Sequence, residues 1–153
     1  MKLQTSQKIK TTKEALWPLL FNSKMDSNKP CRLLMGLPKP MECKLQDQEG
    51  GVGQTRLCVS DKGIIKQNIL EWHPNDKLVF EMKETDIYFG PCVESILESF
   101  TIKTIDSQWV KITRETEIHF KKHSYFLIFP MYIGLKSIHK YVFKNWKNLS
   151  AKK

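Results

Sequence analysis

Long apolar runs are missing from this chain. The longest runs from Tyr125 to Leu135, well short of the roughly 20 residues that span a bilayer, and Pro130 and Gly134 interrupt it. The opening residues, MKLQTSQKIK, contain no apolar segment of the kind that marks a secretory signal. We therefore expect a cytoplasmic protein without a transmembrane segment.

Cysteine is scarce, and no two cysteines form a CxxC pair. With no export signal, we expect the four, which are Cys31, Cys43, Cys58 and Cys92, to be reduced thiols rather than disulfides. His119 and His123 are four residues apart, but they span a strand end and a loop, and no cysteine lies at ligand spacing near them. The sequence predicts neither a metal site nor a cofactor.

The motifs of nucleotide-binding proteins are also missing. There is no GxGxxG and no P-loop, and the glycines at 50–53 precede a predicted strand, so they provide no helix N-terminus for a phosphate. The aromatic residues follow a buried pattern instead of alternating with exposed basic ones, which argues against nucleic-acid binding. No motif indicates a nucleophile–histidine–acid set. These absences argue against a nucleotide-binding or nucleic-acid-binding protein and nominate no catalytic triad.

Acidic residues are outnumbered, 16 against 25 Lys and Arg, which gives a net charge of +9. The lysines are spread from Lys2 to Lys153, a distribution that favours a solvated basic surface. One group lies along the back of the predicted C-terminal helix and comprises Lys136, Lys140, Lys144 and Lys147. We favour a solvated helix back there, and the alternative is a membrane-facing stripe.

Alternating polar and apolar residues dominate the rest of the chain. At 153 residues, the protein is long enough for one domain, 1–153, with its own core. We predict a first strand, a short helix limited by Pro18 and a helical turn at Arg32–Met35. Hairpin-linked strands follow, which predicts an antiparallel meander with one covered face; the strands are 3–10, 41–47, 53–60, 64–72, 77–84, 92–103 and 109–120.

A C-terminal amphipathic helix is predicted to cover that face. Its apolar stripe recurs at spacings of three and four residues and consists of Leu135, Ile138, Val142, Trp146 and Leu149. The stretch from Tyr125 to Gly134 is expected to be less regular, because Pro130 and Gly134 interrupt it, and to form the mouth of a pocket.

Strand alternation assigns several polar residues to the covered face. A two-residue turn at Asn75–Asp76 pairs Phe80 with Glu71 and turns both inward, which leaves Leu70 and Trp72 outside. The polar residues predicted inside are Arg56, Gln67, Glu71, Glu98 and Arg114. They either satisfy one another or orient the polar end of a ligand, unless a bulge shifts the register and turns them outward.

Residues 36–82 resemble the SRPBCC superfamily, also called START-like or Bet v 1-like, and its polyketide cyclase/dehydrase-type branch. The motifs are Pro40, a Gly-x-Gly-x-x-Arg stretch (Gly51, Gly53, Arg56), a turn with Asp61 and Gly63, Ile69-x-Glu71-Trp72 and Leu78-x-Phe80. LWPLLF and YVFKNWKNL resemble the N-terminal and closing helices of that family. The resemblance implies an α+β helix-grip fold, in which a curved antiparallel sheet of about seven strands surrounds a long C-terminal helix, with two short helices after the first strand.

The function that this resemblance and the inward residues favour is binding of a small hydrophobic or amphipathic ligand, such as a lipid, fatty acid, polyketide or polycyclic compound. The ligand-binding candidates are Arg56, Cys58, Ile69, Glu71, Phe80, Met82, Phe100, Ile112, Arg114, Tyr132, Leu135 and Ile138. One alternative is a cyclase or dehydratase that uses Glu71, Glu98 or Arg114. The other is a membrane-surface or partner-binding module. The sequence leans against an enzyme and leaves the oligomeric state open.

Overall fold

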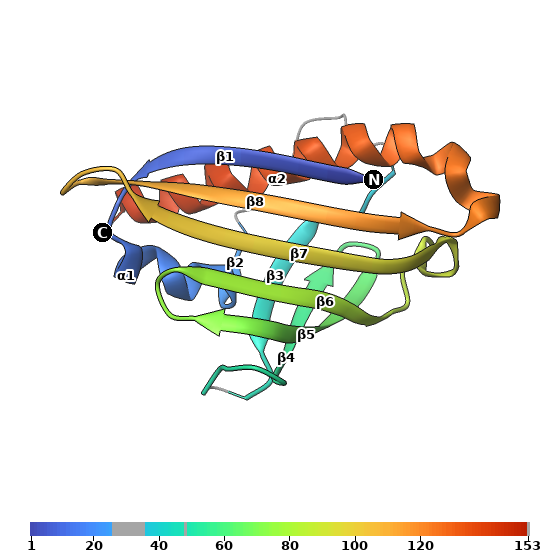
Figure 1. Ribbon diagram of the computed structural model, residues 1–153, viewed down its shortest axis with the longest axis horizontal. Helices are drawn as coiled ribbons and strands as arrows, with labels where there is room; N and C mark the ends of the chain where they lie inside the picture. The colour runs from blue at the N-terminus through green and yellow to red at the C-terminus, as the bar shows by residue number, and fades with distance from the viewer. Residues whose placement is uncertain (26–35, 48, 153) are drawn as a thin grey trace.

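The computed structural model describes residues 1–25, 36–47 and 49–152, and these build one curved antiparallel sheet with a long helix across it (Figure 1). The sheet has eight strands in the order β1-β8-β7-β6-β5-β4-β3-β2. The strands are β1 (Lys2–Lys10), β2 (Ser23–Lys24), β3 (Pro40–Leu45), β4 (Thr55–Ser60), β5 (Gly63–His73), β6 (Lys77–Thr85), β7 (Val93–Thr104) and β8 (Trp109–Phe120). The predicted helix-grip architecture is confirmed, with one short strand more than expected.

Among the described residues, short helices follow β1, precede β7 and follow β8. After β1, α1 (Lys13–Leu16) continues into the 3-10 helix η1 (Trp17–Leu20), where Pro18 ends the α-helical pattern. The 3-10 helix η2 (Gly90–Cys92) precedes β7, and η3 (Lys122–Leu127) follows β8. The helical turn predicted at Arg32–Met35 lies outside the described residues.

The C-terminal helix α2 (Ile128–Ala151) begins earlier than the sequence suggested. Tyr125–Gly134 was expected to be irregular, yet η3 and the first two turns of α2 occupy it. Pro130 is tolerated because it is the third residue of the helix, where a backbone N–H has no partner within the helix. Gly134 is buried on the face toward the sheet.

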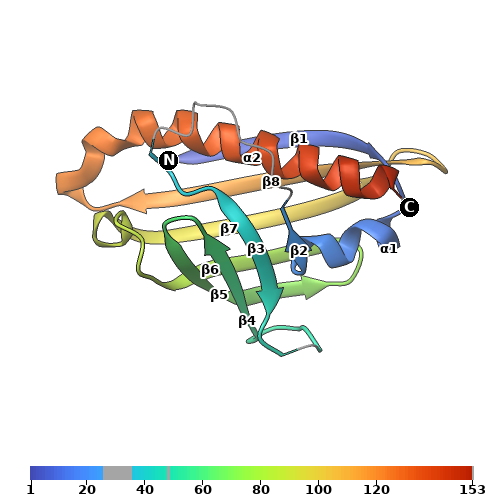
Figure 2. The same ribbon diagram turned by 180° about the vertical axis from the view of Figure 1, so that it is seen from behind.

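The concave face of the sheet carries the core, and α2 lies across it (Figure 2). The predicted stripe is buried from Leu135 to Trp146, and Leu149 is partly buried against the same core. On β7 and β8 the inward sets are also as predicted, since Ile96, Glu98, Phe100 and Ile102 and Val110, Ile112, Arg114, Thr116, Ile118 and Phe120 are all buried. No helix among the described residues has the length and apolar character needed to cross a membrane.

A β-bulge at Leu70 corrects the predicted register of β5. Ile69 pairs with Phe80, but Glu71 pairs with Val79, so the alternation reverses at this point. Trp72, predicted to lie outside, therefore packs inward, with its ring centroid 5.1 Å from Trp17 and 4.8 Å from Phe21. Glu71, predicted to face inward, lies on the outer surface for the same reason.

One buried histidine links α2 to two strands. His139 has Nδ1 2.7 Å from the hydroxyl of Thr5 on β1 and Nε2 2.9 Å from the hydroxyl of Thr116 on β8. Burial, together with the positive charge of Arg114, lowers the pKa of His139 from 6.5 to about 2. The imidazole is therefore neutral at physiological pH, accepting a hydrogen bond at one nitrogen and donating at the other.

This arrangement predicts a pH dependence of stability. An unfolded histidine has a pKa of about 6.5, so below that pH unfolding takes up a proton that folded His139 does not bind. The free energy of unfolding should be insensitive to this group above about pH 6.5. As the pH falls further, it should decrease by up to about 1.4 kcal/mol per pH unit.

Urea unfolding at pH 7.5 and 5.5 measures this slope. His139→Gln should abolish most of the loss between the two pH values, whereas His123→Gln, at an exposed histidine, should retain it. An equal pH dependence in His139→Gln and the unmodified protein would contradict the assignment.

Candidate ligand-binding cavity

A cavity of about 130 Å³ lies between the concave face of the sheet and α2. Its walls are mostly apolar. From the sheet side come Cys43, Cys58, Val59, Ile65, Met82, Ile96, Phe100 and Ile118, and from α2 come Met131, Leu135, Ile138, Val142 and Trp146. The lining also includes Ser23, Met25, Leu37, Pro38, Pro40, Ser60 and Phe89. Such a space suits a small apolar molecule.

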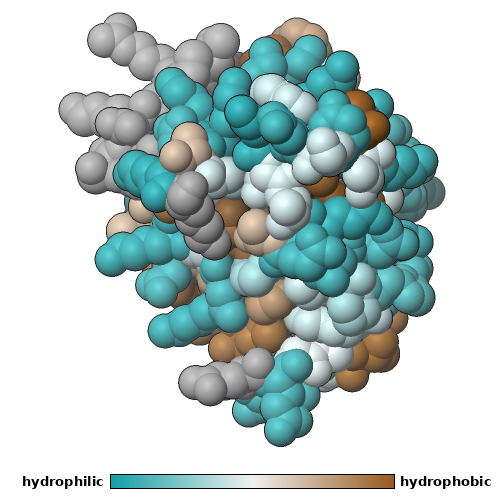
Figure 3. Space-filling model, turned by 90° about the vertical axis from the view of Figure 1, so that its left-hand side faces the viewer, coloured by the Kyte–Doolittle hydropathy of each residue, from teal (hydrophilic) through white to brown (hydrophobic). Residues whose placement is uncertain are grey.

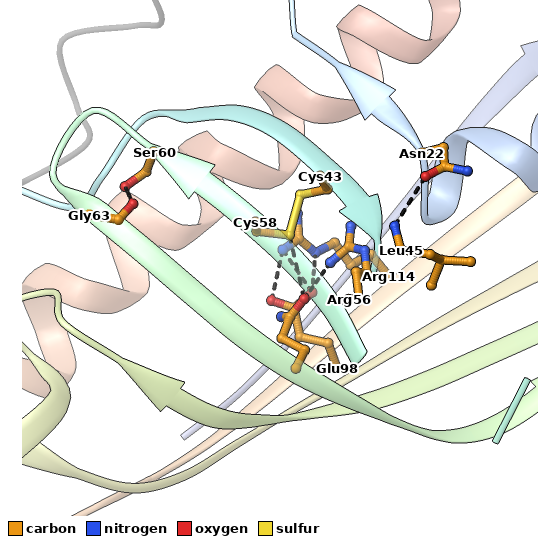
Figure 4. Close-up of a disulfide and its surroundings, with 10 residues drawn as sticks. Asn22, Cys43, Leu45, Arg56, Cys58, Ser60, Gly63, Glu98 and Arg114 are labelled. Carbon is orange, nitrogen blue, oxygen red and sulfur yellow. Dashed lines mark hydrogen bonds and ion pairs between the residues drawn. A yellow bond between two sulfur atoms is a disulfide. The ribbon is translucent and has the colours of Figure 1, made fainter. Parts of the chain in front are cut away.

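Polar side chains gather on the sheet wall of this cavity (Figure 4). Arg114 on β8 donates two hydrogen bonds to Glu98 on β7, from Nε to Oε2 at 3.0 Å and from Nη2 to Oε1 at 2.8 Å. The Arg114 guanidinium also lies over the ring of Phe100, 5.3 Å from its centroid. Both partners are buried, so this is a desolvated, bidentate ion pair that occupies both oxygens of Glu98.

Arg56 on β4 is a second buried arginine with a weaker set of partners. Its Nη1 donates a 2.5 Å hydrogen bond to Oε1 of Gln67, directly opposite on β5, and its guanidinium lies 4.5 Å from the centroid of Phe80. Its Nε has no hydrogen-bond partner among the described residues. Burial lowers the pKa of Arg56 to about 10, with Arg114 contributing and Glu98 opposing. Arg56 therefore remains a cation at neutral pH.

The charges in this cluster do not balance. Two guanidinium groups face one carboxylate, and Gln67 is neutral, so the cluster carries one excess positive charge in a buried place. Two other cavity residues also have an unsatisfied buried polar atom among the described residues, Ser23 at Oγ and Trp146 at Nε1. Native interiors rarely leave such groups without a partner. The cluster can therefore supply hydrogen bonds and positive charge to a bound molecule.

Seven of the twelve sequence-predicted ligand-binding candidates line the cavity: Arg56, Cys58, Met82, Phe100, Arg114, Leu135 and Ile138. Glu98, named as a catalytic candidate, lines it as well. Ile69, Phe80 and Ile112 are buried in the core without lining it.

Two candidates lie elsewhere. Glu71 is 42% exposed on the outer surface, where its carboxylate contacts Lys77 at 3.0 Å and His73 at 3.4 Å. The bulge at Leu70 turned it outward, so its predicted inward orientation is wrong. Tyr132 is exposed on α2, because it lies on the face away from the sheet.

Sequence reasoning missed part of the cavity wall. Ser23, Met25, Leu37, Pro38 and Pro40 come from segments without a regular pattern, so no periodicity could assign them a face. Thr116 and Trp146 were placed on inward faces by alternation and by the helical stripe, but were not singled out as site residues.

The cysteines contradict the prediction of reduced thiols. Cys43 on β3 and Cys58 on β4 are directly opposite in the antiparallel register and form a disulfide beside the polar cluster (Figure 4). Their separation of 15 residues in the sequence does not predict a disulfide, because only the strand register places the two cysteines opposite each other. Cys92 has a free thiol, and Cys31 lies outside the described residues. The cytoplasmic location stays a prediction, and this disulfide weighs against it because cytosolic thiols are kept reduced.

The two arginines should differ in what they contribute to stability. Arg114→Met leaves Glu98 buried without its partner, and we expect a loss of about 3 kcal/mol in the free energy of unfolding. Arg56→Met removes the excess buried cation at the cost of one hydrogen bond to Gln67, so we expect a change within about 1 kcal/mol.

Urea unfolding of both variants at neutral pH makes the comparison, with Lys111→Met as a control at an exposed position on β8. Equal losses in Arg56→Met and Arg114→Met would contradict the charge imbalance described above.

The sequence matches no protein-family model and no curated protein. Its structure, however, is similar to those of several solved proteins. Ara h 8.0201 superposes with a TM-score of 0.70 and 11% identity, over 100% of this chain and 99% of the other. A norcoclaurine synthase from Thalictrum gives a TM-score of 0.67 and 15% identity, over 99% and 94%. A START superfamily protein from Mycobacterium smegmatis gives 0.68 and 7%, over 99% and 97%.

These similarities concern the fold, because all the identities are low. The first two are Bet v 1-like proteins and the third is a START protein, and each superposition extends over nearly the whole of both chains. The fold that the sequence resemblance implies is thereby confirmed: the chain has a Bet v 1-like, START-like helix-grip fold.

Proposed function

We propose that this protein binds a small hydrophobic or amphipathic molecule in the cavity between the sheet and α2. The cavity itself supports this proposal, because apolar side chains from both layers bound it and a polar cluster lies on one wall. Packed cores normally leave few voids larger than a water molecule, so a space of about 130 Å³ has a cost that a ligand would offset.

The size of the cavity limits the ligand. An engineered cavity of about 150 Å³ in another protein binds benzene. By comparison, this space admits one ring or a short alkyl chain with a polar end. A longer fatty acid, a polyketide or a polycyclic compound also fits the proposal if side chains such as Met82 and Met131 move, because unbranched methionines adapt easily.

The geometry supports binding better than the alternative of a cyclase or dehydratase. Of the two carboxylates proposed for proton transfer, Glu71 is on the outer surface and Glu98 already accepts two hydrogen bonds from Arg114. A general base must reach the substrate with an available oxygen. The cluster thus offers donors and positive charge more readily than a proton acceptor.

Binding can be tested with 1-octanol, a neutral amphipathic probe, by isothermal titration calorimetry together with tryptophan fluorescence, to which Trp146 on the cavity wall contributes. We expect one site per chain. Ile138→Phe adds volume inside the cavity and should weaken binding at least tenfold, whereas Ile105→Phe, at an exposed turn position, should leave it unchanged. Absence of saturable binding, or equal binding by both variants, would contradict the proposal.

A second candidate function, contact with an anionic membrane surface, is favoured by the corner formed by η3 and the start of α2. Four aromatic side chains are exposed there, including Phe126 at 75% and Phe129 at 72%, along with Tyr125 and Tyr132. Exposed aromatics gathered in this way are unusual on a soluble surface and typical of membrane interfaces. The opposite end of the molecule, around α1 and the β7–β8 turn, shows many hydrophilic side chains with separate hydrophobic patches between them (Figure 3).

The lysines of α2 also favour contact with an anionic membrane surface. Phe129 and Tyr132 lead along one exposed face of α2 into Lys136, Lys140, Lys144 and Lys147, spaced three or four residues apart. No aspartate or glutamate follows Glu117 in the chain. Aromatic and basic residues on one helix face match the chemistry of an anionic lipid surface.

Vesicle co-sedimentation tests this candidate. We expect binding to vesicles with 30% phosphatidylserine and little to pure phosphatidylcholine, with about a tenfold loss in the Phe126→Ser/Phe129→Ser double variant. Ile105→Ser, an exposed apolar residue at the other end, is the matched control. Binding that is independent of anionic lipid, or unaffected by the double variant, would eliminate a membrane contact at this corner.

A further inference from the structure

The excess positive charge in the cavity wall indicates the chemistry of the ligand. Arg56 is only 5% exposed, yet among the described residues its one hydrogen-bond acceptor is the neutral amide of Gln67. A buried cation without a counter-charge is costly, and proteins normally pair such groups. The aromatic ring of Phe80 offsets part of this cost through a cation–π contact, but it carries no charge.

The carboxylate of Glu98 does not neutralise both arginines, because it is already paired with Arg114. Glu98 uses one oxygen for Nε and the other for Nη2 of Arg114, in the bidentate geometry that fixes both groups. No hydrogen bond or ion pair joins Arg56 to Glu98 among the described residues. The positive charge of Arg56 is therefore the part of the cluster that remains uncompensated.

The other unsatisfied polar groups on the cavity wall also favour a ligand that carries hydrogen-bond acceptors. The unsatisfied atoms of cavity residues are Nε of Arg56, Nε1 of Trp146 and Oγ of Ser23. The first two can only donate hydrogen bonds, and the hydroxyl can also donate. A ligand that supplies acceptor oxygens complements these groups, whereas a cationic ligand would face two arginines.

We propose that the ligand carries a single acidic group, a carboxylate in chemical class, and that Arg56 binds it while the apolar part of the ligand lies toward α2. This proposal rests on the function proposed above. One monoanion balances the one excess charge of the cluster, whereas a dianionic phosphate would leave a buried negative charge. The cluster lies on the strand wall (Figure 4), and Leu135, Ile138 and Val142 line the cavity from α2.

Three eight-carbon probes that differ only in the head group test the proposal: octanoate, 1-octanol and octyl phosphate. Calorimetric titration at pH 7.5 should give octanoate at least tenfold tighter binding than 1-octanol and tighter binding than octyl phosphate. In Arg56→Met, the affinity for octanoate should fall at least tenfold, and the affinity for 1-octanol should stay the same or rise.

Two control variants separate this role from other effects of charge. Lys136→Met removes an exposed positive charge on α2 and should leave all three affinities unchanged, which excludes attraction by the net charge of the protein. Arg56→Lys keeps the charge but loses the planar guanidinium, so it should retain part of the preference for octanoate.

The outcomes distinguish this proposal from the proposed function. If 1-octanol binds in the cavity and octanoate binds no more tightly, the acidic-ligand proposal is wrong and the hydrophobic cavity stands. The same holds if Arg56→Met weakens both probes equally, because Arg56 then acts through the structure alone. Tighter binding of octyl phosphate would overturn the carboxylate assignment. If no probe binds, the proposed function fails first.

Discussion

The packing of α2 onto the concave face of the sheet forms both the core and the cavity of this protein. A continuous apolar stripe from Leu135 to Trp146 removes that face from water, and this burial is the main favourable term. His139 fixes the position of α2 relative to the sheet, because its two ring nitrogens form hydrogen bonds with hydroxyls on β1 and β8. Where the helix and the curled strands do not meet, a cavity remains, and its walls come from both layers.

Buried charged side chains beneath α2 make one wall of that cavity polar. A wholly apolar interior would accept any hydrophobic molecule of suitable size. Here Arg114 and Glu98 compensate each other, and Arg56 remains as a desolvated cation beside the apolar wall. In a medium of low dielectric constant one uncompensated charge outweighs many dispersion contacts, so under the proposed binding function this charge would select the polar group of the ligand.

The sequence predicted the parts of this structure that depend on local periodicity. Alternation on β7 and β8 placed Glu98, Arg114 and Thr116 inside correctly, and the helical stripe identified the covering face of α2. The failures have non-local causes. A single extra residue at Leu70 reversed the faces of Glu71 and Trp72, and the Cys43–Cys58 disulfide depends on a strand register that spacing does not reveal. Pro130 was read as a helix breaker, although the first turn of a helix tolerates it.

If the interior holds a ligand whose acidic group binds Arg56, a crystal structure of the protein grown with octanoate will show it. We expect electron density for the probe in the cavity, with a carboxylate oxygen within about 3 Å of the Arg56 guanidinium and the alkyl chain toward Ile138. A cavity filled by repacked side chains, with Arg56 turned into solvent or paired with Glu98, would contradict it.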